Sequence, residues 1–402
     1  MTTTTGLMAL ETGDPIDFDR MRRERLQRAL AAMERHGLDV LLLAKPANVR
    51  YVAGSRNLWT ASRRPFSPSA IVLRDRAEVH LMSLWDFGIP RAIPRQHLFP
   101  SSWNPAHLME SVSRIVGPSR RGRIGVDQMS PRFSALLSEA FPQASVVDGA
   151  TAMGEARAVK TAEEIECLGT AIAIAEAALM EAIGALRPGV PESTLLGVFE
   201  RRATDFGVTS PAFQGGFCVQ PAERGAANDA TRTAPPMRQM TSQRPVQAGE
   251  LATMSGGVHY AGYESDVGRT WLSGDAGAAN SVVEAQRTLF RRWNGACQLM
   301  AEQCRPGKTA ADLRRAFQKS EILPRAPIAH GAGLGFEPPI VGTDLGEEVE
   351  EACVLQPGMV LVLQPYVWEE GVGGFWAKET VLITDDGHRR LTRLPHGPLA
   401  QG

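Results

Sequence analysis

The sequence has few cysteines, no excess of charge of either sign and no long hydrophobic run. Its five cysteines are odd in number and show no CxxC spacing, so we expect reduced thiols in a cytoplasmic protein. A formal net charge of -1 gives no indication of a nucleic-acid or anionic membrane partner. The sequence contains no run of about 18 apolar residues, and its acidic N-terminus differs from a signal peptide.

The chain of 402 residues, 43% of them hydrophobic, is long enough for two or three domains with large buried cores. Residues 1–16 predict a flexible arm. Over 17–152, apolar residues at helical spacing alternate with short buried strands such as LDVLLLA, which indicates an α/β domain with its own sheet. A long amphipathic helix then begins at a capping-box pattern, Thr161 with Glu164, and opens a second domain over 153–402.

The second domain contains a weak internal repeat. LRPGVPESTLLGVFERR and CRPGKTAADLRRAFQKS share RPG, then a leucine and a phenylalanine at equal offsets, which are Leu195 and Leu313, and Phe199 and Phe317. In each copy a long helix would end at a Pro-Gly turn before a second amphipathic helix. This pattern predicts a twofold-repeated α/β unit.

Five short blocks of the second domain carry a family likeness. In order they are AVKTAEEIE, GYESDVGRT, AHGAGLGFEPP, LQPGMVLVLQP and AKETVLITDDG. Together they resemble the pita-bread family of methionine aminopeptidases, proline-specific aminopeptidases, prolidases and creatinase. GLDVLLLAKPANVRYVAGS resembles the N-terminal domain of creatinase and prolidase, and the ending LTRLPHGP is most similar to the creatinase branch. The resemblance implies an α/β (α+β) fold, in which a creatinase-like N-terminal α/β domain precedes a C-terminal pita-bread domain.

The metal enzymes of this family hold two divalent ions with five residues, and the resemblance places those positions at Ser255, Asp266, His330, Gln364 and Glu379. Hard divalent ions draw most of their binding from carboxylates, and Ser255 and Gln364 are not carboxylates. We therefore expect no dinuclear centre. Either one divalent transition metal remains at Asp266, His330, Gln364 and Glu379, or the site is metal-free. Without metal, the facing carboxylates of Asp266 and Glu379 would share a proton beside His330.

Four further residues are candidates for substrate binding. Arg238 aligns with the catalytic histidine of creatinase, and its guanidinium suits a substrate carboxylate better than proton transfer. Arg64 lies in a basic loop that is either merely solvated or, as the resemblance to the creatinase branch implies, reaches a partner subunit's site and binds the substrate carboxylate. Ser255 is either a hydrogen-bond donor or a filler, and His259 is either a base or a surface histidine in a hairpin-like turn.

The function that we expect is a creatinase-like, metal-independent hydrolysis of a carbon-nitrogen bond in a small carboxylate-bearing substrate. His330 and Glu379 would share proton transfer, with Asp266 orienting them, and Gln364 would hydrogen-bond the substrate or the tetrahedral intermediate. Three alternatives stay open: a mononuclear-metal hydrolase or lyase, an Xaa-Pro peptidase-like enzyme, and a non-catalytic pita-bread binding protein. We expect a homodimer that acts on a small molecule and binds neither nucleic acid nor membrane.

Overall fold

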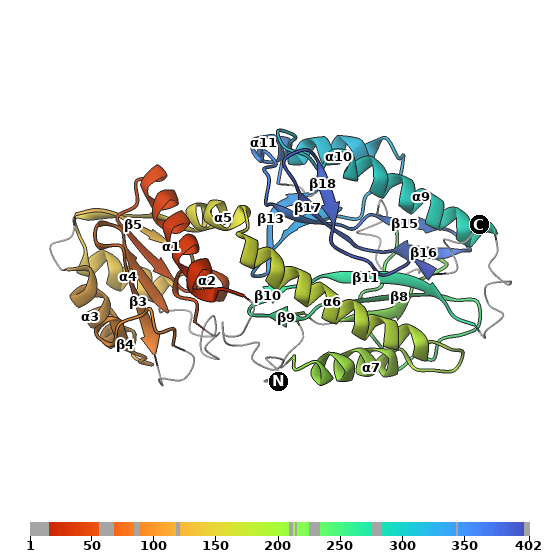
Figure 1. The fold of residues 1–402 in the computed structure, drawn as a ribbon, viewed down its shortest axis with the longest axis horizontal. Coiled ribbons are helices and arrows are strands. Elements are labelled where there is room, and N and C mark those ends of the chain that lie inside the picture. Colours follow the sequence, from red (N-terminus) through yellow and green to blue (C-terminus); the bar gives the residue numbers. More distant parts are fainter. Residues whose placement is uncertain are drawn as a thin grey trace. The chain divides into compact units, whose positions relative to one another are not determined.

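The structure is a computed structural model that describes residues 16–55, 68–83, 89–117, 121–208, 212–213, 215–224, 234–274, 284–342 and 345–397. Its contacts divide the chain into two compact units, residues 1–164 and 165–402 (Figure 1). The division falls later than the expected boundary at residue 152, because α5 (Ala150–Ala158) packs against α1 (Phe18–Arg35) of the first unit. The expected arm lies outside the described residues except for Ile16, which is buried.

The first unit is built on a six-stranded mixed sheet with the order β4-β3-β2-β1-β5-β6. The strands are β1 (Val40–Leu43), β2 (Ala70–Leu73), β3 (Glu78–Ser83), β4 (Leu98–Pro100), β5 (Gly122–Val126) and β6 (Ala144–Asp148). The helices are α1, α2 (Pro46–Ala53), α3 (Pro105–Val116), α4 (Pro131–Ala140), α5 and the short 3-10 turns η1 (Arg74–Arg76) and η2 (Arg95–His97).

The apolar sequence of β1, VLLL, explains its central place in this sheet, because helices cover both faces and all four residues are buried. Val40 and Leu42 point to one face and join a core with Leu108 of α3 and Phe133 of α4. Helices α1 and α2 lie on the opposite face (Figure 1).

The second unit has two larger antiparallel sheets, with the orders β11-β8-β7 and β13-β12-β14-β17-β18, and the hairpins β9-β10 and β15-β16. The strands are β7 (Gly216–Val219), β8 (Leu251–Gly256), β9 (His259–Tyr260), β10 (Tyr263–Glu264), β11 (Val267–Leu272), β12 (Ala329–Ala332), β13 (Phe336–Val341), β14 (Val360–Leu363), β15 (Tyr366–Glu369), β16 (Gly373–Trp376), β17 (Glu379–Ile383) and β18 (His388–Arg390). The helices are α6 (Ala162–Ala185), α7 (Glu192–Asp205), α9 (Glu284–Ala301), α10 (Ala310–Gln318) and α11 (Glu347–Ala352).

Helix α6 begins at the predicted capping box. The Thr161 amide donates to Glu164 Oε2 at 2.8 Å, and the Glu164 amide donates to Thr161 Oγ1 at 3.2 Å. The helix is long and apolar enough to cross a membrane by length and composition. Because 61% of its most apolar window is buried inside the structure, α6 has the character of a core helix.

The predicted repeat corresponds to two similar helix-turn-helix pairs, α6 with α7 and α9 with α10. Its matched residues, Leu195, Phe199, Leu313 and Phe317, are all at most 2% exposed, so both copies bury the same face. Helix α7 packs on the β11-β8-β7 sheet, and α9 and α10 pack on the other (Figure 1). A β-bridge between Gly268 and Lys378 joins the two sheets.

Candidate functional site

Three buried charged residues meet at the seam between the two sheets. Asp266 directly precedes β11, His330 lies on β12, and Lys378 directly precedes β17. His330 Nε2 lies 3.1 Å from Asp266 Oδ2, and Lys378 Nζ donates to Asp266 Oδ1 at 2.5 Å. Asp266, His330 and Lys378 are 9%, 2% and 4% exposed, so the carboxylate is held between an ammonium group and an imidazole away from solvent. We call these three residues the Asp266 cluster.

Strand register explains why Lys378 belongs to the cluster. On the five-stranded sheet His330 pairs with Val362, and Val362 pairs with Thr380. Directly paired residues of antiparallel strands share a face, and so do residues two apart on one strand. Lys378 therefore lies on the same face as His330, and the bridge to Gly268 brings it beside Asp266.

The structure corrects the expected role of Glu379, whose side chain lies on the opposite face of β17. It forms ion pairs with Arg269 at 3.1 Å and Arg390 at 3.3 Å, and its Oε1 lies 2.8 Å from His396 Nε2. It also accepts a short hydrogen bond from Thr392. The expected pair of facing Asp266 and Glu379 carboxylates is not formed, because neighbouring residues of a strand point to opposite faces.

Ser255 and Gln364 lie next to the Asp266 cluster. Ser255 pairs with Gly268 on β11, and a Cβ at Gly268 would stand 3.3 Å from Lys378 Cγ and 3.5 Å from Ser255 Cβ. The buried Ser255 hydroxyl has no hydrogen-bond partner among the described residues. Gln364 follows β14 and lies on the same face as Lys378. Its side-chain Nε2 donates to Pro327 O at 3.0 Å, so this amide group is already hydrogen-bonded to the backbone.

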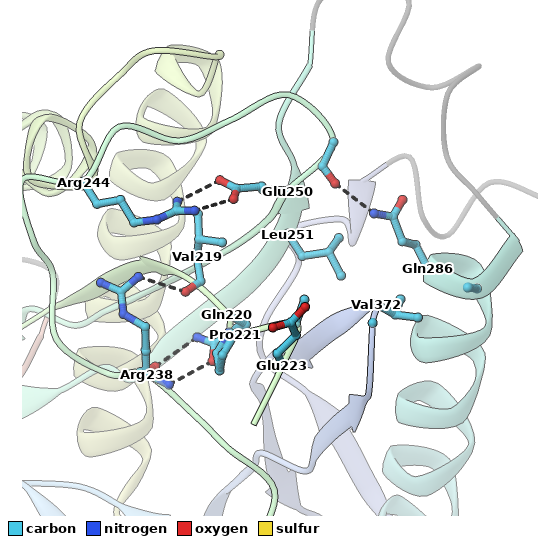
Figure 2. A pocket seen from close by; sticks show the side chains of 14 residues that line it. Val219, Gln220, Pro221, Glu223, Arg238, Arg244, Glu250, Leu251, Gln286 and Val372 are labelled. Carbon is cyan, nitrogen blue, oxygen red and sulfur yellow. Dashed lines mark hydrogen bonds and ion pairs between the residues drawn. The ribbon is translucent and has the colours of Figure 1, made fainter. Parts of the chain in front are cut away.

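Arg238 is placed elsewhere, at a cavity of about 610 Å³ near the start of β8 (Figure 2). Its guanidinium makes two hydrogen bonds to the fully buried Glu192, at 2.8 and 2.9 Å. A second arginine of this cavity, Arg244, is paired with Glu250 (Figure 2). Because both guanidinium groups are already neutralised, Arg238 is not placed as a carboxylate anchor for the Asp266 cluster.

The two remaining candidates do not join the cluster in the described structure. His259, on the β9-β10 hairpin, lies 3.7 Å from Glu264 Oε2. The Glu264 amide donates to Gly333 O at 2.8 Å, so this hairpin contacts the segment that follows His330. Arg64 lies outside the described residues.

Aromatic rings lie against Lys378 and His330, the two partners of Asp266 in the cluster. Lys378 Nζ lies 4.4 Å from the ring centre of Trp376 and 5.3 Å from that of Phe213. Both distances fit cation-π contacts, which stabilise an ammonium group in a desolvated place. Phe336 stacks on His330 at a centroid distance of 4.1 Å and is 51% exposed, so one face of the imidazole is covered by a ring that reaches solvent.

The electrostatics of the cluster favour an ionised carboxylate. Burial raises the pKa of Asp266, but the charge of Lys378 and the hydrogen bond from His330 more than offset this and hold the pKa below its ordinary value. His330 faces two acceptors, because its Nδ1 also lies 2.9 Å from Gly331 O. Only the doubly protonated imidazolium can donate to both.

Lys378 is the site residue that sequence reasoning missed. It directly precedes Glu379, and both stand in the apolar stretch GFWAKETVLIT, where only one of two neighbours can face a given side. The signal that could have identified it is a lysine beside Trp376, inside a segment that is otherwise apolar. A buried lysine there requires a carboxylate partner.

These residues do not fit the dinuclear metal site that the family implies. Asp266 is the only carboxylate in the cluster, and the Lys378 ammonium already contacts it at 2.5 Å. Two unit positive charges about 4 Å apart repel by roughly 4 kcal/mol at an effective dielectric constant near 20, and a divalent ion doubles this. The repulsion between Lys378 and a divalent ion also opposes the expected mononuclear site at Asp266, His330, Gln364 and Glu379. In addition, Glu379 points to the opposite face of the sheet and cannot serve as a ligand there.

Comparison with known proteins identifies relatives of both units. Residues 166–385 match metallopeptidase family M24, and residues 25–159 match the creatinase/prolidase N-terminal domain. Creatinase from Bacillus sp. (strain B-0618) is 25% identical over 394 residues, covering 91% of this chain and 89% of the relative. The Xaa-Pro dipeptidase of Pyrococcus furiosus is 26% identical over 386 residues, covering 92% and 98%.

The fold agrees with these matches. The solved prolidase of Pyrococcus horikoshii OT3 superposes with a TM-score of 0.72 at 21% identity, covering 93% of this chain and 99% of that one. The two-domain α/β (α+β) architecture and the family resemblance expected from the sequence are confirmed. The chain belongs to metallopeptidase family M24, in the superfamily of hydrolases that includes creatinase, prolidase and aminopeptidase P.

Proposed function

We propose that the chain is a metal-independent, creatinase-like hydrolase that cleaves a carbon-nitrogen bond in a small carboxylate-bearing substrate. The observation that carries this proposal is the 2.5 Å ion pair between Lys378 and Asp266. It supplies a fixed positive charge at a carboxylate that the family resemblance assigns to metal binding. The resemblance to creatinase, one of the relatives, implies that hydrolysis in this fold can proceed without metal, which supports the proposal.

His330 is the proposed proton donor. Hydrolysis adds the hydroxyl of water to the carbon atom while the carbon-nitrogen bond breaks and the nitrogen takes up a proton from His330; the proton that water loses then returns to His330, which ends the reaction protonated as it began. A protonated His330, held through Nε2 by Asp266, can supply that proton to the leaving nitrogen. Asp266 would position the ring and stabilise its charged form, which is the orienting role expected for it from the sequence, whereas the share of proton transfer expected for Glu379 has no place here because Glu379 lies on the opposite face of β17.

The net charge of the cluster supports an anionic substrate. Lys378 and a protonated His330 contribute two positive charges, and Asp266 contributes one negative charge. The resulting net positive charge favours a substrate carboxylate or a developing oxyanion in this buried place. The unpartnered hydroxyl of Ser255 is a further hydrogen-bond donor close to the Lys378 stem.

A hydrolysis assay tests the proposal. The substrates are guanidino-substituted and N-acylated amino acids on one side and Xaa-Pro dipeptides on the other, each with and without a chelator. We expect turnover of the first group that is unchanged by chelation and is lost in Lys378→Met. The exposed Lys319→Met is the matched control and should retain full activity.

Other outcomes separate the alternatives. Activity that disappears on chelation and returns with Mn²⁺ would falsify the metal-independent proposal. Turnover of Xaa-Pro dipeptides alone would instead assign the chain to the peptidases. If no substrate turns over while a small carboxylate raises the melting temperature of the wild type but not of Lys378→Met, the chain is a binding protein that has kept the pocket.

A further inference from the structure

A second polar cluster lies in the first unit, at the sheet edge formed by β3 and β4. Glu78 and His80 are two residues apart on β3 and therefore point to the same face. Strand β4 runs parallel to β3, with Leu98 paired to Leu81, so the preceding His97 stands beside His80. The two imidazole rings stack with centroids 4.3 Å apart and an interplanar angle of 27°.

The ligating atoms of these three residues converge. His80 Nε2 lies 3.2 Å from Glu78 Oε2, and His97 Nε2 lies 3.9 Å from Glu78 Oε1. One donor atom from each of the three residues falls within 4.8 Å of the others. Among the described residues, these two histidines are the only basic side chains beside the Glu78 carboxylate, and no arginine or lysine forms an ion pair with it.

Their burial suits a built site more than a solvated surface pair. His80 is 8% exposed, and the side chains of His97 and Glu78 are 17% and 29% exposed. Two imidazole nitrogens and one carboxylate are held by strand β3 and by the end of the 3-10 turn η2 directly before β4, so little side-chain freedom remains to be lost on binding an ion. The partial exposure of Glu78 leaves a path for an ion and for water.

We propose that Glu78, His80 and His97 bind one divalent transition-metal ion of the zinc class. Two imidazoles and a carboxylate form a three-ligand donor set that zinc accepts, with water at the fourth position. This site lies in the first unit and shares no residue with the Asp266 cluster. It is therefore independent of the proposed hydrolase function.

Metal titration of the full chain, after treatment with a chelator, tests this inference. Calorimetry measures the binding of Zn²⁺, and visible absorption measures the binding of Co²⁺. We expect one ion per chain, with affinity reduced more than about tenfold in both His97→Ala and Glu78→Gln. Mg²⁺ should not bind, because it prefers oxygen ligands in an octahedral arrangement. His36→Ala is the matched control, since it removes a histidine paired with Glu155 at 2.7 Å in the same unit.

The inference is overturned if the wild type binds no Zn²⁺ or Co²⁺, or if His97→Ala and Glu78→Gln bind as tightly as the wild type. Circular dichroism of both variants checks that they remain folded. Asp266→Asn provides the remaining distinction. It should keep the Zn²⁺ stoichiometry of the wild type, and loss of the ion in this variant would place the metal at the Asp266 cluster instead.

Discussion

Lys378 and Glu379 are neighbours in the chain but belong to separate charge networks. Lys378 meets Asp266 and His330 on one face of the sheet, whereas Glu379 meets Arg269, Arg390 and His396 on the other. Each network surrounds a buried carboxylate with at least one cation and with hydrogen-bond donors, which together hold the pKa of that carboxylate below its ordinary value. Removing a single cation from either network therefore leaves a buried carboxylate short of a partner.

The first prediction concerns Lys378→Met, which keeps the length of the side chain and removes its charge. Because Asp266 loses its closest cationic partner, the free energy of unfolding should fall by about 3 kcal/mol. The double variant Asp266→Asn with Lys378→Met should recover much of this loss, because neither the buried carboxylate nor the buried ammonium group then remains without its partner. Urea unfolding at pH 7 measures both. Lys319→Met should stay within about 0.5 kcal/mol of the wild type, and equal values for the two lysine variants would contradict the prediction.

The second prediction concerns pH. The folded-state pKa of Asp266 lies below the ordinary value of 3.8, so its contribution to stability is fully present above that value. The contribution is lost as the pH falls through the lowered folded-state pKa. Asp266→Asn should therefore lose less stability than the wild type on acidification below about pH 4. Melting temperatures across this range test the claim, and the exposed Asp385→Asn should follow the wild-type curve.

Single-residue roles were only partly predictable from the sequence. Asp266 and His330 occur in distinctive blocks, and the structure brings them into contact as expected. Which of Lys378 and Glu379 faces Asp266 depends on which face of the sheet each residue of β17 points to. A shift of one residue in the strand register moves every side chain of the strand to the other face. For Arg238, the residue type suggested an anion anchor, but its buried partner Glu192 lies 46 positions earlier in the chain and cannot be identified from local sequence.

At the scale of elements, Arg269 of β11 links three segments that are distant in the sequence. Its guanidinium donates to Leu394 O at 2.7 and 3.1 Å, to Gly268 O at 2.8 Å and to Lys378 O at 2.6 Å. It also pairs with Glu379 at 3.1 Å and is 1% exposed. Arg269 thereby fixes the C-terminal segment and the backbone of Lys378 to the same strand.

The third prediction is that Arg269→Lys destabilises the second unit by about 3 kcal/mol, although the charge is kept. A lysine has three donors on one nitrogen and cannot reproduce the planar guanidinium contacts, so buried carbonyl groups lose their partners. Hydrogen exchange should accelerate over residues 391–397. The exposed Arg201→Lys serves as control and should exchange as the wild type does. Unchanged protection in Arg269→Lys would show that the segment is held by other contacts.

The helices and strands were easier to predict from the sequence than the way in which they pair in the fold. Helical spacing and the repeated Pro-Gly turns indicated α6, α7, α9 and α10, because amphipathic periodicity is a local property. The bridge between Gly268 and Lys378 joins positions 110 residues apart, and no local pattern specifies it. The unit boundary was also displaced, because the packing of α5 on α1 is a tertiary contact.

At the scale of the whole molecule, the two units carry different cation chemistry. The fourth prediction is that Zn²⁺ slows hydrogen exchange in β3 and β4 of the first unit and leaves β14 and β17 of the second unit unchanged. When the free Zn²⁺ concentration is one hundred times the dissociation constant of the site, Zn²⁺ binding should stabilise the first unit by about 2.7 kcal/mol. His97→Ala should abolish the effect. Protection that appears first in β14 and β17 would contradict the assignment.

Two properties of the whole chain remain predictions from the sequence, namely the homodimer and the cytoplasmic location. Analytical ultracentrifugation of the wild type tests the first. A molar mass of twice 43.5 kDa would confirm a dimer, and a single-chain mass would contradict it.

The ammonium group at Asp266 is covalently part of the chain, and this changes how the site acquires its positive charge. A bound ion has a dissociation constant, competes with other ions and depends on supply from the surroundings. Lys378 has none of these properties, because every chain that folds carries it at full occupancy. Glutamate and lysine codons differ by one base, so a single nucleotide change at position 378 would replace this internal cation with a carboxylate and make the site's charge depend on ions from outside.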